Sequence, residues 1–372
     1  MHILALEPYY GGSHKAFLDG WARRSKHTWT LLTLPAYKWK WRMRHSAIHF
    51  AQQAKELISE GEIWDIIFCS DILNLAEFLG LVGQSVQKLP SIVYFHENQL
   101  TYPVRFESER DYQFAMTNTT TALAATDVWL NSSFHRDSFL EALEKFLKQM
   151  PDFQPLDAVE KIRIKSSIYP PGIEDIKPSI KKDTGPIHIL WAARWEHDKN
   201  PEDFFEALKI LKNSNVDFSI SVIGRQFRDS PEIFLWAKDY FAENIEHWGY
   251  QKTRTEYEQI LQQADVIVST ARHEFFGLSV LEAISAGAYP LLPKRLSYPE
   301  ILGLGETVKA ESFFYDGTVK TLANELILLA KRKGKGNLWQ ELPDPAELTS
   351  RFKWKNITGP LDDAVSNSLV AG

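Results

Sequence analysis

The sequence of 372 residues contains a single cysteine, Cys69. One cysteine excludes an intramolecular disulfide, and one thiol is too few for a zinc site built on thiolates. Cys69 ends the apolar run at residues 66–69, so we expect a buried, unreactive thiol. Nothing in the cysteine content contradicts a reducing compartment.

Long hydrophobic runs are also missing. No stretch approaches the ~20 apolar residues that a membrane span needs. The start of the chain, MHILALEPYYGGSH, is interrupted too early for a signal peptide and looks like a strand that enters a glycine turn. We therefore expect a soluble, cytoplasmic protein with no membrane partner.

The sequence also lacks an excess of positive charge. Lys and Arg number 42 against 48 Asp and Glu, which gives a formal net charge of −6. Proteins that wrap nucleic acid non-specifically are usually basic, so any RNA contact here must be confined to a local patch. The apolar share of 44% and the length favour two domains, each with a core of its own.

Short apolar runs alternate with longer amphipathic stretches, which is typical of βαβ units and a parallel sheet. In the first half we expect strands at residues 3–6, 29–33, 65–68, 92–95 and 128–131, and helices at 46–59 and 133–148. In the second half we expect strands at 187–193, 218–223, 266–270 and 289–292, and helices at 201–211, 253–263 and 278–286. The predicted fold class is α/β, with two Rossmann-like, doubly wound parallel-sheet domains.

A polar, turn-rich stretch at residues 180–186 separates the two series and is predicted to be a linker. We place the first domain at residues 1–180, the second at 181–350 and a tail at 351–372. Ligands of doubly wound domains bind outside the carboxyl ends of the strands. The expected active site is therefore the cleft between two facing domains.

Two groups follow strands of the first domain. Gly11 and Gly12 come directly after the first strand, where paired glycines allow backbone to approach a ligand and a helix can offer free N–H groups. His96 follows the strand at 92–95, where a histidine can bind a sugar or position a hydroxyl. A tight turn and a buried histidine are the alternatives, and the residues alone leave them open.

Cations alternate with large apolar residues in the segment KWKWRMRH at residues 38–45. In an extended conformation the four cations would share one face, and Trp39, Trp41 and Met43 the other. Indole rings stack on bases or sugars, and cations bind phosphates. The alternative is a solvated basic edge with its tryptophans in the core. The four cations are Lys38, Lys40, Arg42 and Arg44.

Arg194 and Lys199 follow the first strand of the second domain, where two cations can neutralise a diphosphate leaving group. A surface cluster of ion pairs is the alternative. Glu196 and Asp198 lie between them and offer two carboxylates to a divalent metal. We expect no metal there, because Arg194 and Lys199 can pair with these carboxylates instead.

The most informative stretch is RHEFFGLSVLEA at residues 272–283. A strand precedes it and a helix is predicted to begin near Leu278, so free N–H groups can face a phosphate, and Gly277 permits a close approach. Glu274 lies in the loop near the bound group, and Glu282, about two turns further on, can reach a ribose diol. As isolated residues, the two acids are ordinary surface carboxylates.

Glu274 and Glu282, with seven residues between them, resemble the E-x7-E signature of the retaining GT-B enzymes of glycosyltransferase family 4. The stretches EPYYGGSHKAF, LPAYKWKWRMRHSAIHFAQ and YFHENQLTYPV are more specific. They resemble the tRNA-queuosine mannosyltransferases, which transfer mannose from GDP-mannose to queuosine in the anticodon loop of tRNA-Asp. The chain departs from many relatives at Pro170–Ile173 (PPGI), where they have Asn-Gly-Val-Asp.

The resemblance implies a GT-B fold, a retaining transfer without a metal, an acceptor-binding first domain, a donor-binding second domain and a tail that crosses back onto the first. It also implies that His96, Glu274, Arg194 and Lys199 act in catalysis. The implied donor-binding residues are Gly11, Gly12, Arg194, Lys199, Glu274, Phe276, Gly277, Leu278 and Glu282. From the residue types themselves, cations for phosphates and indoles for bases, we expect tRNA to bind at Lys38, Trp39, Lys40, Trp41, Arg42, Arg44 and Asn98. No obligate protein partner is expected.

Three rival functions remain at this stage. One is a family 4 enzyme with a lipid, polysaccharide or small-molecule acceptor. A membrane-facing form should carry a basic amphipathic helix in its first domain, whereas the basic segment here alternates as a strand would and is rich in Trp. The second is a sugar-nucleotide epimerase on the same scaffold, which consumes its substrate without an acceptor. The third is a non-catalytic binding protein, which the presence of Arg194, Lys199, Glu274 and Glu282 disfavours.

Overall fold

The computed structural model describes residues 1–104, 110–178, 185–227, 229–304, 310–339, 342 and 344–371. The chain forms two compact units and passes from one to the other twice. Unit 1 consists of Met1–Gly172 and Trp354–Gly372, and unit 2 of Ile173–Lys353. These boundaries lie a few residues before and after those inferred from the sequence. Most of the expected linker at 180–186 lies outside the described residues.

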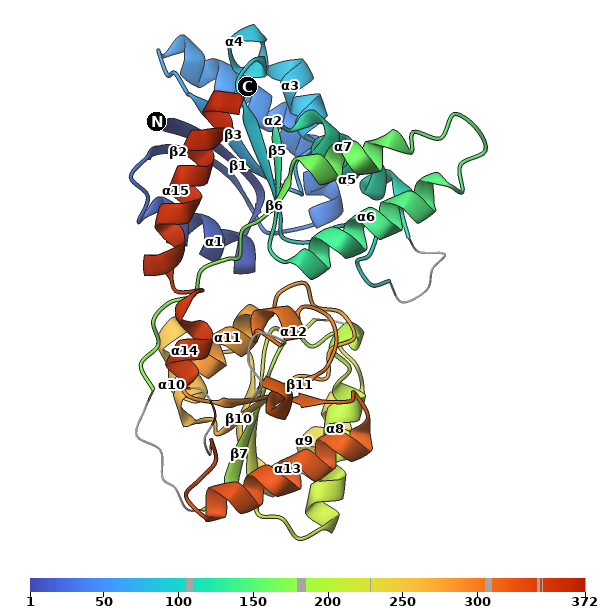
Figure 1. Ribbon diagram of the computed structural model, residues 1–372, viewed down its shortest axis with the longest axis vertical. Helices are drawn as coiled ribbons and strands as arrows, with labels where there is room; N and C mark the ends of the chain where they lie inside the picture. The colour runs from blue at the N-terminus through green and yellow to red at the C-terminus, as the bar shows by residue number, and fades with distance from the viewer. Residues whose placement is uncertain are drawn as a thin grey trace. The chain divides into compact units, whose positions relative to one another are not determined.

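Unit 1 contains a sheet of six parallel strands in the order β2-β1-β3-β4-β5-β6 (Figure 1). The strands are β1 (His2–Tyr10), β2 (Thr28–Pro35), β3 (Ile66–Ser70), β4 (Ser91–Phe95), β5 (Asp127–Leu130) and β6 (Ser166–Ile168). The helices are α1 (Gly12–Ala22), α2 (Trp39–Ser59), α3 (Leu75–Val82), α4 (Gln84–Gln87), α5 (Tyr112–Ala124), α6 (Ser133–Leu147), α7 (Asp157–Ile164) and α15 (Trp354–Ala371). The strand order reverses between β1 and β3.

The central strands of unit 1 are buried on both faces, so their side chains alternate between two cores. Leu4, Ile67 and Val93 belong to the core that α2, α3, α5 and α6 complete. Cys69 lies in this core as expected, and burial raises the pKa of its thiol. The opposite face holds a group of aromatic rings made by Phe17, Trp21, Phe68, Tyr94 and Trp129.

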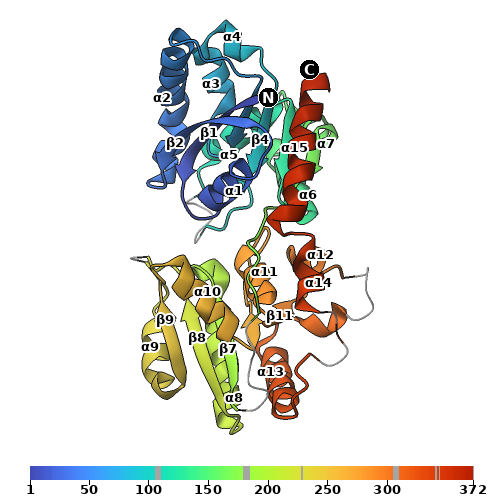
Figure 2. The same ribbon diagram turned by 90° about the vertical axis from the view of Figure 1, so that its left-hand side faces the viewer.

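The last helix, α15, belongs to unit 1 and packs beside α1 (Figure 2). Its first residue, Trp354, lies against Gly20 of α1 and against Gly172. A Cβ atom at either glycine would sit 2.3 Å from the indole ring, so both positions require glycine. Gly172 falls in the stretch that departs from many relatives, and its role here is to admit Trp354.

Asp362 joins α15 to the end of α1. It is buried and accepts hydrogen bonds from Trp21 Nε1 at 2.8 Å, Ser25 Oγ at 2.7 Å and the Lys26 backbone N–H at 2.8 Å. Asp362→Ala leaves these three donors without an acceptor, so we expect the free energy of unfolding to fall by about 3 kcal/mol.

Denaturant unfolding measures this loss, and Asp363→Ala is the matched control. The Asp363 side chain is 70% exposed and pairs with Lys26 at 2.7 Å, so its removal should leave the free energy of unfolding nearly unchanged. Equal stability of the two variants would show that Asp362 does not anchor α15.

Unit 2 contains a second sheet of six parallel strands, in the order β12-β11-β10-β7-β8-β9. The strands are β7 (Ile187–Ala192), β8 (Phe218–Ile223), β9 (Ile245–Gly249), β10 (Val266–Val268), β11 (Tyr289–Pro293) and β12 (Phe314–Tyr315). The helices are α8 (Pro201–Asn213), α9 (Ile233–Tyr240), α10 (Arg254–Gln263), α11 (Leu278–Ser285), α12 (Tyr298–Ile301), α13 (Val319–Gly334) and α14 (Pro345–Ser350), with single 3-10 turns at His197–Lys199, Ala242–Asn244 and Ala310–Phe313. The strand order reverses between β7 and β10.

Every strand predicted from the sequence is confirmed, and three strands were missed. β6 and β12 have only three and two residues, and β9 (IEHWG) mixes charged and apolar residues without a clear period. None of the helices in the described part of the chain is long and apolar enough to cross a membrane.

The prediction of an extended segment at residues 38–44 is wrong. α2 begins at Trp39 and not near residue 46, and Lys38 precedes it in the left-handed conformation (φ 52°, ψ 61°). Lys, Arg and Met are good helix formers, and Met43 is buried in a small cluster with Ile72 and Phe114. Helix formation and this anchor override the period-two alternation of residue types.

Candidate functional site

The strand order of unit 2 reverses between β7 and β10, so the carboxyl ends of these two strands are the expected ligand site. Such a point is called a switch point, and ligands of open α/β sheets bind there. Arg194 and Lys199 follow β7, and Glu274 follows β10. Three of the residues inferred from the sequence therefore lie at one edge of the sheet.

Lys199 is buried at this edge, with 6% of the residue exposed. Its Nζ atom donates to the His273 carbonyl at 2.7 Å and lies 3.2 Å from both Glu274 Oε2 and Asp198 Oδ2. Burial by itself lowers the pKa of Lys199, but Glu274 and Asp198 outweigh burial and raise it. Lys199 is thus a fixed, buried cation and not part of a mobile surface cluster.

Glu274 is the partner that links this cation to the loop before α11. Burial acts to raise the pKa of Glu274, but the charge of Lys199 outweighs it and the pKa is lowered. The Glu274 side chain keeps 27% of its surface exposed, so a ligand can still reach it. A charged carboxylate that is both accessible and held by a buried lysine is suited to accept hydrogen bonds from hydroxyl groups.

Arg194 pairs with Glu196, at 3.2 Å from Nε to Oε2, and its side chain is 42% exposed. Together with the pair between Lys199 and Asp198, this contact confirms that the two cations neutralise the carboxylates between them. The two carboxylates therefore each have a positive partner within the protein.

The N-terminus of α11 carries no side-chain cap. Gly277 precedes the helix at φ 99°, a conformation that favours glycine, and a Cβ atom there would lie 3.1 Å from the Tyr298 ring. Ser297 Oγ donates to the Phe276 carbonyl at 3.0 Å and fixes the turn. The backbone of Phe276, Gly277 and Leu278 thus leads into a helix start of the kind that binds anions.

Glu282, inside α11, has partners that the sequence analysis missed. Its two carboxylate oxygens accept hydrogen bonds from Arg254 Nη1 at 2.7 Å and Tyr257 Oη at 2.8 Å, both from α10. Burial lowers the pKa of Arg254, but Glu282 and Glu258 outweigh burial and raise it. No local pattern connects α10 with α11, so only the fold reveals this pairing.

In unit 1 the strand order reverses between β1 and β3, and a second polar cluster lies there. Glu7 and His14 are buried, and Glu7 Oε2 lies 3.1 Å from His14 Nδ1. Potential ligand atoms of Glu7, His14 and His96 lie within 4.8 Å of one another, a spacing that would allow one metal ion to bind all three. The contact between Glu7 and His14 already has the length of a hydrogen bond, so these two atoms satisfy each other.

Gly11 and Gly12 begin α1 beside this cluster. A Cβ atom on Gly11 would lie 2.5 Å from the Ala36 Cβ, so this glycine serves packing. Gly12 has φ 54°, and a Cβ atom there would meet nothing within 4 Å. Of the two, Gly12 has the open backbone that a ligand needs.

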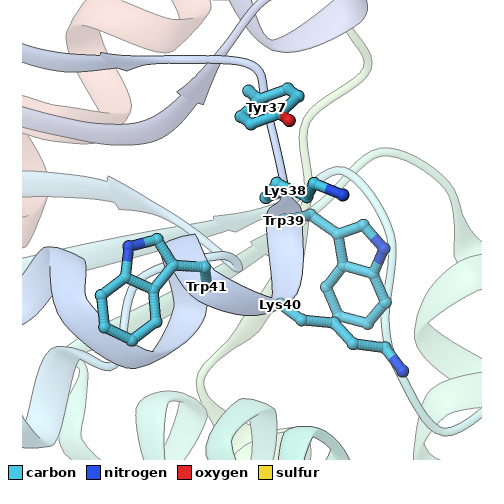
Figure 3. Close-up of a pocket in the computed structure, with 5 residues that line it drawn as sticks. All are labelled: Tyr37, Lys38, Trp39, Lys40 and Trp41. Carbon is cyan, nitrogen blue, oxygen red and sulfur yellow. The ribbon is translucent and has the colours of Figure 1, made fainter.

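The basic segment forms the first turns of α2 and surrounds a pocket of about 410 Å³ lined by Tyr37, Lys38, Trp39, Lys40 and Trp41 (Figure 3). The two indoles extend to different sides of the helix start (Figure 3). Trp39 packs on Phe114 at 5.2 Å between ring centroids, whereas Trp41 is 59% exposed and stacks on His45 at 4.9 Å. Trp41 is therefore the ring that a ligand can stack on.

The four cations of this segment do not share one face, contrary to expectation. Lys40 and Arg44 lie one turn apart and both approach the Phe114 ring, at 5.9 and 4.8 Å from its centroid. Arg42 turns to the Pro35 carbonyl, at 3.1 Å from Nε, and to the His45 ring. Arg42 therefore supports the entry to α2 and does not join Lys40 and Arg44.

Asn98 is also corrected as a tRNA-binding candidate. It is fully buried, and its Oδ1 accepts hydrogen bonds from the backbone of Leu100 at 3.1 Å and Thr101 at 2.9 Å. This side chain organises the turn after β4 and is not accessible to RNA. A short polar residue after a strand predicts such a turn as readily as a ligand contact.

Comparison with known proteins agrees with this arrangement. Residues 2–173 match the family model of the tRNA-queuosine alpha-mannosyltransferase N-terminal region, and residues 172–341 match that of glycosyl transferases group 1. A tRNA-queuosine alpha-mannosyltransferase of Drosophila melanogaster is 39% identical over 312 residues, which cover 81% of each chain. A glycogen synthase of Mycobacterium tuberculosis is 23% identical over 66% of this chain and 60% of its own.

Solved structures share the fold at low identity. Anabaena HepE in complex with UDP-glucose has a TM-score of 0.69 at 15% identity and covers 99% of this chain and 100% of its own. Sucrose-phosphate synthase from Thermosynechococcus elongatus has a TM-score of 0.69 at 13% identity, with 100% and 99% covered. Two parallel six-stranded units with these neighbours establish a GT-B fold. The chain is a glycosyltransferase, and its identity to the Drosophila protein over most of both chains shows that it belongs to the tRNA-queuosine alpha-mannosyltransferase family.

Proposed function

We propose that this enzyme transfers mannose from GDP-mannose to queuosine in tRNA-Asp, with retention of the anomeric configuration. The observation that carries the proposal is the buried Lys199, held against Glu274 at the switch point of unit 2 beside the uncapped start of α11. This arrangement offers fixed positive charge, backbone donors and an accessible carboxylate to a sugar diphosphate. The kinship with the Drosophila enzyme supports the choice of sugar and acceptor.

In the proposed reaction, the bond between the anomeric carbon and the diphosphate oxygen breaks as the acceptor hydroxyl bonds to the same face of that carbon. The hydroxyl proton passes to the departing phosphate oxygen. Arg194 and Lys199 stabilise the negative charge that grows on the diphosphate, which is the main catalytic contribution of the protein. Glu274 binds sugar hydroxyls, and His96 contacts the transferred sugar.

Other donor contacts are proposed in each unit. In unit 2 the backbone at Phe276, Gly277 and Leu278 contacts sugar and phosphate, and in unit 1 Gly12 offers backbone that a ligand can approach. Glu282 accepts from the ribose diol. Because Arg254 and Tyr257 already orient this carboxylate, it meets the ribose without a loss of side-chain freedom.

For the acceptor, we propose that the start of α2 binds the anticodon loop. Trp41 stacks on an unpaired base, and Lys38, Lys40 and Arg44 contact phosphates. The local concentration of cations suits a protein with a net charge of −6. Since this segment is a basic helix, its conformation no longer argues against a membrane-bound acceptor; family membership is what favours RNA.

Metal independence follows from the same cations, because Arg194 and Lys199 take the place of Mg²⁺ at the diphosphate. We expect calorimetry in the presence of EDTA to show GDP-mannose binding with unchanged affinity, and tighter binding than for UDP-glucose. Transfer to tRNA should also continue in EDTA. Binding or turnover that EDTA abolishes and Mn²⁺ restores would instead show a required metal, with Glu196 and Asp198, or Glu7, His14 and His96, as its candidate ligands.

A further inference from the structure

Titratable side chains gather in unit 1 where β1, β3 and β4 end: Glu7, His14, Asp71 and His96. Of these, the proposed function uses His96. The backbone of His96 is fixed on both sides. Its N–H donates to Asp71 Oδ1 at 2.9 Å, and its carbonyl accepts from Asn131 Nδ2 at 3.0 Å. Asp71 itself is fully buried. The backbone alone does not decide how the imidazole ring is turned.

The ring of His96 is oriented by its neighbours on α1. The His14 ring stacks against it, with centroids 3.9 Å apart and planes inclined by 31°. Phe17 meets it edge-on at 5.5 Å. His14 in turn is held by Glu7, whose other carboxylate oxygen accepts from Ser70 Oγ at 3.0 Å and the Tyr9 backbone at 2.8 Å. A chain of contacts therefore runs from β1 through His14 to the face of His96.

The two histidine rings in this series of contacts have opposite pKa shifts. Burial lowers the pKa of His14, but Glu7, Asp71 and Glu97 outweigh burial and raise it to about 9. Burial lowers the pKa of His96 well below its ordinary value, and electrostatic interactions with His14 and His135 lower it further. The charged or titratable groups that act on the two rings are Glu7, Asp71, Glu97 and His135. These shifts favour the proton on His14 over His96, and burial also raises the pKa of the neighbouring Asp71, to about 8.

We propose that Glu7 and His14 are positioning residues for His96: their buried ion pair retains the proton on His14, whose ring supports His96 as a neutral imidazole. A neutral imidazole has one donor and one acceptor nitrogen, so it can engage sugar hydroxyls in both senses. An imidazolium has no acceptor and would place a positive charge beside the sugar. The proposal rests on the proposed function, in which His96 contacts the transferred sugar.

Glu7→Gln tests the proposal because it removes the negative charge and keeps the shape of the side chain. The pKa of His14 falls when the Glu7 charge is lost, so His14 loses its proton near neutral pH. Above that pH no charged ring lies against His96. Since the proposal requires a protonated His14, the basic limb of the kcat profile should move to lower pH. We also expect roughly a tenfold loss of kcat at pH 7, with KM for GDP-mannose unchanged.

Asp19→Asn is the matched control, because Asp19 also pairs with a cation of α1, Lys15, but lies outside this cluster. It should leave the pH profile unchanged. A readout that does not depend on the acceptor is nitrogen NMR of selectively labelled histidine rings, assigned with His14→Gln and His96→Gln. We expect an imidazolium at His14 up to pH 8, a neutral ring at His96 down to pH 5.5, and a neutral His14 in Glu7→Gln.

Three results would overturn the proposal. One is a neutral His14 ring in the wild type at pH 7. Another is a basic limb of Glu7→Gln that coincides with that of the wild type. The third is one equivalent of a tightly bound divalent metal in the purified protein, lost in Glu7→Gln, since a metal would replace the His14 proton. Failure of mannose transfer alone would refute the proposed function and leave the ring titration to decide the network.

Discussion

Lys199→Met is expected to reduce kcat for mannose transfer by roughly 10²–10³-fold, the usual cost of removing one fixed group that stabilises transition-state charge. Lys199 is the buried cation at the switch point of unit 2, and its ammonium group is held in place by Glu274, Asp198 and the His273 carbonyl. The position of this positive charge is therefore preorganised. Steady-state kinetics with GDP-mannose and queuosine-containing tRNA measures the effect.

The same burial means that Lys199→Met is not neutral for stability. It leaves Asp198 and Glu274 without their shared cation, and breaking a buried ion pair costs about 3–5 kcal/mol. Asp198→Asn in the same chain removes one of the two charges and should restore much of the melting temperature. Turnover should stay low in this double variant. A stable double variant with near-normal kcat would reject the role of Lys199.

Lys209→Met is the matched control for both measurements. Lys209 lies on α8, with 42% of its side chain exposed, and pairs with Glu206 at 3.4 Å. Exposed pairs of this kind contribute less than about 1 kcal/mol. Melting temperature and kcat should both remain close to those of the wild type.

Replacement of Lys38, Lys40 and Arg44 by Ala is expected to weaken tRNA binding at least tenfold at physiological salt. Each cation that contacts single-stranded RNA contributes about 0.7 to the slope of log K against log salt, so three losses should flatten the slope by roughly 2. Arg42 stays in place, because its bonds to Pro35 and His45 support the start of α2. Binding of GDP-mannose should not change.

The matched control replaces three lysines of the same unit, Lys145, Lys148 and Lys161. Each pairs with an acidic residue one helical turn away, at 2.6 Å. Their loss should affect tRNA binding much less. Equal salt slopes for the two triple variants would contradict the proposed RNA surface. If the variant without Lys38, Lys40 and Arg44 loses binding to anionic vesicles but keeps tRNA binding, and the control variant keeps both, a lipid acceptor is favoured instead.

The residues at the switch points could be inferred from the sequence because the rule behind them is local. Apolar runs mark β7 and β10, and polar residues at their carboxyl ends, such as Arg194 and Glu274, fall at the edge where α/β ligands bind. The parallel order of the strands then brings these residues together. Burial of Lys199 did not follow from the pattern, because it depends on acids that lie on two separate loops.

Other parts of the site depend on contacts that no local pattern contains. Arg254 and Tyr257 reach Glu282 from a neighbouring helix, and Glu7 meets His14 across the turn after β1. The basic segment shows the opposite failure. Its alternation predicted a strand, but good helix formers and the buried Met43 make it the start of α2.

The most direct test of the central claim is mass spectrometry of tRNA nucleosides after incubation with separate nucleotide sugars. Queuosine-containing tRNA-Asp should gain one hexose per queuosine with GDP-mannose and none with UDP-glucose or UDP-galactose. The same tRNA with guanosine in place of queuosine should remain unmodified, and Lys199→Met should give almost no product. Queuosine left unmodified by every donor, under conditions in which the enzyme binds GDP-mannose, would contradict the account.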